Sequence, residues 1–173
     1  MRNIAGIEAL FAYQGPLSAA VSALKFRHDL AVAGPLGRLL AHAPIHHDGE
    51  WDLIVPVPLH ARRLLGRGFN HSELIARWMI RALRPSTTTK ARPRVATALR
   101  RLRATPPQTE LPARLRTANV AGAFRPVGGL QGCNVLVVDD VTTTGATLHA
   151  CIDTLSGAGA RRVAGLALLR TLA

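Results

Sequence analysis

The spacing of hydrophobic and polar positions changes several times along the chain and predicts alternating strands and helices. Apolar residues recur at helical spacing in four segments, 16–26, 30–41, 71–83 and 146–156. Short, nearly continuous apolar runs predict three buried strands, at 52–58, 134–138 and 163–169. The order strand–helix–strand–helix–strand from residue 52 onward predicts an α/β fold, with a parallel sheet and helices on its faces.

The remaining segments predict connections and two weaker elements. Residues 59–70 form a basic, glycine-containing segment that we expect to be a loop. Residues 95–102 resemble a strand, and residues 111–118 resemble a short arginine-rich helix. We therefore expect a sheet core over residues 50–173, with residues 1–49 forming a small N-terminal helical hood or lead-in over the site.

Composition excludes several classes of protein. No apolar run reaches the roughly 18 residues that a membrane-spanning helix requires. The first residues lack the compact apolar region of a signal peptide, so a cytoplasmic location is expected. The chain has only two cysteines, Cys133 and Cys151, which excludes a disulfide framework and a zinc site made of cysteines alone.

Charge changes this picture, because the formal net charge of +12 is concentrated in one segment. Residues 62–116 hold 14 Lys and Arg against two acids, whereas the rest of the chain is balanced at eight of each. Such a concentration indicates a surface that faces a polyanion, either the phosphates of a small ligand or a nucleic-acid backbone. A solvated basic face without a partner is the alternative interpretation.

The segment 135–147 carries the most specific chemistry. Four apolar residues are followed by Asp139 and Asp140, and then by a loop with four threonines and Gly145 that opens a predicted helix. Ligands of open α/β sheets bind beyond the carboxyl ends of the strands, and a helix N-terminus offers N–H groups to phosphate. Two adjacent carboxylates beside a phosphate suit paired sugar hydroxyls. These residues predict a ribose 5-phosphate site.

This segment resembles the phosphoribosyl diphosphate (PRPP) binding motif of type I phosphoribosyltransferases at all 13 positions. The resemblance implies the type I phosphoribosyltransferase fold, a parallel sheet with flanking helices and a small N-terminal hood. It also implies that Asp139 and Asp140 hold the ribose hydroxyls. The 5-phosphate would be bound by the following loop, namely Thr142, Thr143, Thr144, Gly145, Ala146 and Thr147.

Further segments, at 13–26, 55–70, 105–108 and 116–124, resemble the ComF family of competence proteins in the family's order. In related transferases the loop after the first sheet strand contacts the diphosphate. In this sequence the resemblance therefore implies that the diphosphate is contacted by Pro58, Leu59, His60, Arg62, Arg63 and Arg67. Mg2+ accompanies PRPP in such relatives, and we expect no metal held by protein side chains. ComF-like proteins commonly begin with a four-cysteine zinc ribbon, which this sequence lacks, and any partner bound through that ribbon is then in question.

One difference from related transferases leaves the catalysed reaction undecided. Purine-salvage transferases often carry an Asp general base where this chain has Thr143, and an unperturbed Thr hydroxyl is no base near neutral pH. Phosphoribosyl transfer to ammonia or to an anionic base, and sensing of PRPP or ribose 5-phosphate without turnover, are both compatible with the sequence, so enzymatic activity is undecided. The alternative is a non-enzymatic competence factor that handles single-stranded DNA, with other competence proteins as partners.

Overall fold

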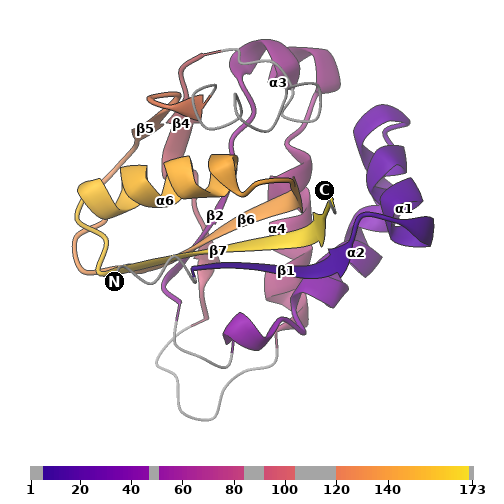
Figure 1. Ribbon diagram of the computed structural model, residues 1–173, viewed down its shortest axis with the longest axis horizontal. Coiled ribbons are helices and arrows are strands. Elements are labelled where there is room, and N and C mark those ends of the chain that lie inside the picture. Colours follow the sequence, from indigo (N-terminus) through magenta and orange to yellow (C-terminus); the bar gives the residue numbers. More distant parts are fainter. Residues whose placement is uncertain (1–5, 47–50, 84–91, 104–119, 172–173) are drawn as a thin grey trace.

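A five-stranded parallel sheet forms the centre of the molecule in the computed structural model (Figure 1). The structure describes residues 6–46, 51–83, 92–103 and 120–171. The strands lie in the order β1 (Ile7–Ala12), β7 (Arg162–Arg170), β6 (Asn134–Thr142), β2 (Leu53–Pro56) and β3 (Arg94–Val95). The long central strands β6 and β7 pair along their whole length, so the end of β6 is held in a fixed place.

Both faces of the sheet are covered, which explains why its central strands are almost continuously apolar. One face packs against α1 (Gly15–Phe26), α2 (Ala33–Leu40) and α4 (His71–Ala82). The other packs against α6 (Ala146–Gly157) and a small antiparallel sheet of β4 (Leu99–Arg101) and β5 (Phe124–Pro126). Alternate residues of β6 serve the two cores: Leu136 and Val138 join the first, whereas Val135 and Val137 join the second.

Three short helices complete the described elements. The 3-10 turns η1 (Leu30–Val32) and η2 (Pro44–His46) flank α2, and α3 (Ala61–Arg67) follows β2. Helices α2 and α4 approach closely at Gly37, where an added Cβ would lie 2.5 Å from the Trp78 Cβ and 2.8 Å from the Ile75 carbonyl oxygen. This close packing fixes α4, whose first turn reaches the end of β6.

Several sequence-based expectations need correction. Residues 7–12 were expected to precede the sheet, but β1 is its edge strand and pairs with β7. Glu8 interrupts the apolar pattern that would have predicted this strand. Its carboxylate accepts a hydrogen bond from the Ile45 backbone N–H at 3.1 Å. The boundary near residue 49 stays a prediction. The expected loop 59–70 contains α3, which ends at Gly68 in the left-handed conformation with φ +78°.

Two further strand predictions were wrong in extent. Residues 95–102 form no single strand, because β3 belongs to the large sheet and β4 to the small one. Strand β6 continues past residue 138 to Thr142, so Asp139 and Asp140 lie inside it. The predicted helix at 111–118 falls outside the described residues. Among the helices that the structure describes, none is long and apolar enough to cross a membrane.

Candidate functional site

A cavity of about 570 Å³ opens at the carboxyl end of the sheet. It lies where β6 ends and α6 begins, with α1 and α3 on its other sides. Its polar and charged lining comes from six elements and their loops: Tyr13, Lys25, Arg63, Arg67, His71, Ser72, Arg101, Asp139, Asp140, Thr142, Thr143, Thr147 and Thr171. This is the position at which open α/β sheets bind their ligands.

The two carboxylates of β6 converge on the first turn of α4. The Ser72 hydroxyl donates to Asp139 Oδ1 at 2.9 Å, and the backbone N–H of Asp140 donates to the same oxygen at 3.0 Å. The Lys25 ammonium lies 2.5 Å from Asp140 Oδ2, and His71 Nε2 lies 3.4 Å from Asp140 Oδ1. The sequence thus places the two acids next to each other, and the fold gives each its own partners.

The pKa values of the two acids are shifted in opposite directions by burial and by the surrounding charges. Burial and the neighbouring Asp140 charge raise the pKa of Asp139 to about 7, against the smaller lowering effects of Lys25, His71 and Ser72. Burial alone would also raise the pKa of Asp140, but the nearby Lys25 and His71 hold it well below its usual range. Asp140 is therefore the permanently charged member of the pair, and Asp139 titrates near neutral pH.

The threonine loop forms a cradle at the start of α6. Gly145 caps the helix with φ +81°, a left-handed conformation that favours glycine. An added Cβ there would lie 3.2 Å from the His149 ring and 3.3 Å from Ile7 Cδ1. The cradle lines the cavity through Thr142, Thr143, Gly145, Ala146 and Thr147. Free N–H groups at a helix N-terminus and the threonine hydroxyls both suit a phosphate.

Arginines form a further part of the cavity lining, and Arg67 donates a hydrogen bond to His71 Nδ1 at 3.1 Å. Arg63 and Arg67 reach it from α3, and Arg101 reaches it from β4. Burial lowers the pKa of Arg67 and of Arg101, and the charge of Arg63 lowers both further. Three cations gathered around one space repel one another, and an anion between them would relieve that repulsion.

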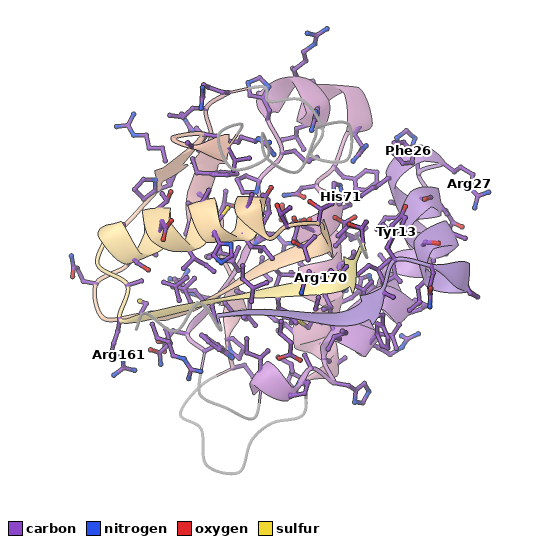
Figure 2. All side chains as sticks on the ribbon, viewed as in Figure 1. Tyr13, Phe26, Arg27, His71, Arg161 and Arg170 are labelled. Carbon is purple, nitrogen blue, oxygen red and sulfur yellow. The ribbon has the colours of Figure 1, made fainter. Side chains whose placement is uncertain are left out.

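The end of α1 and the residues just after it cover the site through three contacts. Besides the Lys25–Asp140 pair, Arg67 stacks on the Phe26 ring with its guanidinium carbon 5.5 Å from the ring centre. His28 meets Phe69 edge to face at 5.8 Å between ring centres. Figure 2 shows Phe26 at the end of α1, and Tyr13 and His71 between that helix and the ends of β6 and β7. The N-terminal segment thus contributes residues to the cavity.

The fold brings most of the predicted site residues together. The cavity lining includes Pro58, Leu59, Arg63, Arg67, both acids and the cradle residues except Thr144. His60, Arg62 and Thr144 are not part of the lining. The ring of His60 accepts a hydrogen bond from the Arg62 N–H at 3.2 Å and caps α3, and the Thr144 hydroxyl accepts one from the Ala146 N–H at 3.4 Å. These hydrogen bonds stabilise the backbone at the starts of α3 and α6.

Sequence analysis assigned no role to Lys25, Ser72 or Arg101, which the structure places in the site. A signal existed for Lys25, since it lies in the segment 13–26 that resembles ComF proteins and is one of only two lysines beside 20 arginines. His71 was not assigned to the site from the sequence either, yet it contacts Asp140. No local pattern marks Ser72 or Arg101, because their site neighbours are distant in sequence.

A resident divalent cation does not fit this arrangement. His71, Asp139 and Asp140 each offer one ligand atom, and these atoms lie within 4.8 Å of one another. However, the Lys25 ammonium already lies against Asp140, and the other oxygen of that carboxylate faces His71. The positive charge beside the acids is therefore a side chain of the protein.

Comparison with known proteins gives close relatives but no match to a family model. The chain is 38% identical over 169 residues to DNA utilization protein YhgH of Salmonella typhi and over 165 residues to that of Escherichia coli K12. Each match covers 92% of this chain and 70% of the relative. Competence protein F of Haemophilus influenzae is 30% identical over 145 residues, which cover 79% of this chain and 60% of that protein.

A solved structure supplies the comparison of folds. Glutamine PRPP amidotransferase from B. subtilis matches with a TM-score of 0.50 and 22% identity. The match covers 78% of this chain and a quarter of the amidotransferase chain. This likeness confirms the predicted fold class, the type I phosphoribosyltransferase fold, and at this identity it shows the fold alone.

Proposed function

The chain belongs to the family of competence protein F and DNA utilization protein YhgH, and we propose that its pocket binds PRPP. One observation carries this proposal. The 570 Å³ cavity combines an acidic pair, a threonine cradle at a helix N-terminus and three arginines. A sugar with a phosphate at one end and a diphosphate at the other has a counterpart for each of these three groups.

Each part of the ligand has a chemical counterpart in the cavity. The 5-phosphate suits the backbone and hydroxyl donors of residues 142–147. The ribose hydroxyls suit Asp139, whose carboxylate is half-buried and lines the cavity beside Asp140. The diphosphate suits Arg63, Arg67 and Arg101, since guanidinium groups bind phosphate oxygens in pairs. A ligand with two phosphate groups would neutralise both ends of the site.

Transfer to a purine is disfavoured by the cradle itself. Thr143 lines the cavity in place of a carboxylate base, so deprotonation of a purine N–H has no obvious agent at that position. The proposed function is thus binding of PRPP either for transfer to ammonia or an already anionic base, or for sensing without turnover. Release of diphosphate, measured with and without candidate acceptors, distinguishes transfer from sensing.

Calorimetric titration of the purified protein tests the binding proposal. PRPP should bind more tightly than ribose 5-phosphate by at least about tenfold, because the diphosphate adds charge-assisted contacts with arginines. Inorganic sulfate at the same ionic strength is the control for unspecific anion binding. Absence of heat with PRPP under all ionic conditions, or equal affinity for PRPP and sulfate, would overturn the proposal.

Handling of single-stranded DNA is a second candidate function, favoured by the names of the relatives and by the basic segment 62–116. Some arginines of that segment lie outside the cavity and are exposed, among them Arg62 on α3 and Arg100 on β4. Both elements lie at the same end of the molecule (Figure 1). One PRPP molecule does not account for these charges, whereas a DNA backbone would.

Salt dependence of binding tests this second candidate. The affinity for an oligonucleotide should fall steeply with salt, and Arg100→Gln should reduce the slope by about one unit if the residue contacts a phosphate. Arg38→Gln removes an exposed charge from α2, away from β4, and should leave the slope unchanged. A flat salt dependence, or equal effects of the two variants, would count against a DNA surface on β4.

A further inference from the structure

The acidic pair is already provided with positive charge by the protein. Lys25 Nζ lies 2.5 Å from Asp140 Oδ2, His71 Nε2 lies 3.4 Å from Asp140 Oδ1, and Ser72 donates to Asp139 Oδ1. Three of the four carboxylate oxygens thus contact protein donors. A divalent cation that bound this pair would have to displace the ammonium or lie beside it, where like charges repel.

Lys25 is held in this position by the packing of its helix. Its neighbour Leu24 is fully buried in the core shared by α1, α2 and α4, and Val21 one turn earlier is fully buried too. Phe26 and His28, on the other side of Lys25, contact Arg67 and Phe69. The Lys25 side chain itself is 20% exposed. The packing on both sides therefore fixes the backbone of Lys25 within side-chain reach of Asp140.

From this geometry we propose that Lys25 supplies the positive charge that a divalent cation would otherwise supply, so that the pocket binds PRPP without Mg2+. The inference rests on the proposed function and concerns the counterion of that same site. Arg63, Arg67 and Arg101 line the same cavity, so the chain also has cationic groups for the phosphates of a ligand. Mg2+ carried by free PRPP is then not required for binding.

The first experiment compares PRPP binding in excess EDTA and in excess Mg2+ by calorimetry. We expect the wild-type affinity in EDTA to lie within about threefold of that in Mg2+, a difference of less than one contact to a charged group. Binding in Mg2+ that weakens more than about tenfold in EDTA would overturn this inference and leave the proposed function intact. Absence of binding in both solutions would overturn the proposed function, and the inference with it.

The second experiment removes the ammonium. Lys25→Met keeps much of the length and the apolar stem of the side chain, and it should weaken PRPP binding in EDTA about 10- to 100-fold. Excess Mg2+ should restore much of that loss, because a cation can now approach the three ligand atoms of His71, Asp139 and Asp140. Equal binding by Lys25→Met and wild type in EDTA would overturn the inference.

The matched control is Arg27→Met. Arg27 is exposed at the C-terminal end of the same helix, and Figure 2 shows its side chain pointing away from the site. This variant removes the same charge from nearly the same place without touching the acidic pair. It should bind PRPP as the wild type does, in EDTA and in Mg2+. An equal loss in both variants would mean that general charge, and not the Lys25–Asp140 contact, sets the affinity.

A measurement without PRPP shows whether the variant is folded and whether its acidic pair takes a metal ion. Thermal unfolding is recorded for wild type, Lys25→Met and Arg27→Met with Mg2+ or Mn2+ alone. Only Lys25→Met should gain stability from the metal, by about 2 °C or more, since ligands that bind the native state raise the melting temperature. A metal-induced shift of that size in the wild type would overturn the inference, because the acidic pair would then take a cation despite Lys25.

Discussion

The two walls of the pocket are built in different ways. The contiguous wall is residues 139–147, where the end of β6 and the start of α6 bring the acids and the phosphate cradle together in one stretch. The assembled wall consists of Lys25, Arg63, Arg67 and Arg101, which come from α1, α3 and β4. Local backbone geometry makes the first wall, and only the folded chain makes the second.

This difference indicates that the two walls would bind different parts of the ligand. The contiguous wall has the donors and acceptors for a ribose 5-phosphate, which any relative with the same stretch would also offer. In the proposed function, the assembled wall adds the positive charge that would distinguish a diphosphate from a single phosphate and a metal-free site from a metal-dependent one. Changes in the contiguous wall should therefore affect all phosphoribosyl ligands alike, whereas changes in the assembled wall should affect them selectively.

The largest effect is expected where the two walls meet, at the Asp140–Lys25 pair. Asp140→Asn leaves the ammonium of Lys25 without its counter-charge. It should lower the free energy of unfolding by about 2–4 kcal/mol at pH 7, a value reduced from that of a fully buried pair because Lys25 is partly exposed. Urea denaturation measures it. The folded pKa of Asp140 lies below its unfolded value near 4, so its stabilisation exists above that pH and is lost as the pH falls further. Equal stability of variant and wild type would contradict the pairing.

Selectivity is the next largest effect and concerns the assembled wall. Arg67→Ala should weaken PRPP binding about 10- to 100-fold and ribose 5-phosphate binding by less than about threefold, because only PRPP has the diphosphate. Calorimetry with both ligands measures the ratio. Arg62→Ala, an exposed neighbour on α3 outside the cavity, is the control and should change neither affinity. Equal losses for both ligands in Arg67→Ala would remove the distinction between the walls.

A uniform effect is expected from the contiguous wall. Thr147→Val removes one hydroxyl from the cradle and should weaken PRPP and ribose 5-phosphate about equally, each by about tenfold. Thr154→Val, two turns further along α6, removes a hydroxyl that donates to the Ala150 carbonyl oxygen at 2.7 Å outside the cavity. This control should leave both affinities unchanged. A selective loss of PRPP in Thr147→Val would place the diphosphate at the cradle instead.

The smallest effect separates the two neighbouring acids. The folded pKa of Asp139 is raised to about 7, so its ionised form costs stability in the folded chain. Its favourable contribution is complete below pH ~4 and is lost as the pH rises through about 7. Asp139→Asn should therefore melt about 2 °C or more above the wild type at pH 8 and level with it at pH 4. A lower melting temperature at pH 8 would contradict the assigned pKa direction.

The sequence predicted the contiguous wall well because its information is local. An apolar run, two acids, four threonines and a glycine are enough to place a strand, a loop after it and a helix start. The extent of β6 was underestimated, since Asp139 and Asp140 are polar positions inside a strand that continues to Thr142. Strand pairing with β7 along that length overrides the low strand preference of aspartate.

The assembled wall could be predicted only in part. Arg63 and Arg67 could be predicted because they follow the first predicted strand in a basic segment, although Gly66 and Gly68 wrongly predicted a loop where α3 lies. Lys25 and Arg101 meet the acids through packing between segments far apart in sequence. The edge strand β1 was missed because Glu8 interrupts its apolar pattern, and its pairing with β7 is likewise long-range.

A crystal structure of the protein with PRPP would locate the phosphorus atoms and so test whether the pocket binds PRPP as proposed. We expect the 5-phosphate within hydrogen-bond distance of the N–H groups of residues 144–147 and the diphosphate between Arg63, Arg67 and Arg101. The ribose should lie against Asp139, with Lys25 still in contact with Asp140. A ligand in the reverse orientation, or one seated outside the cavity, would contradict the proposal.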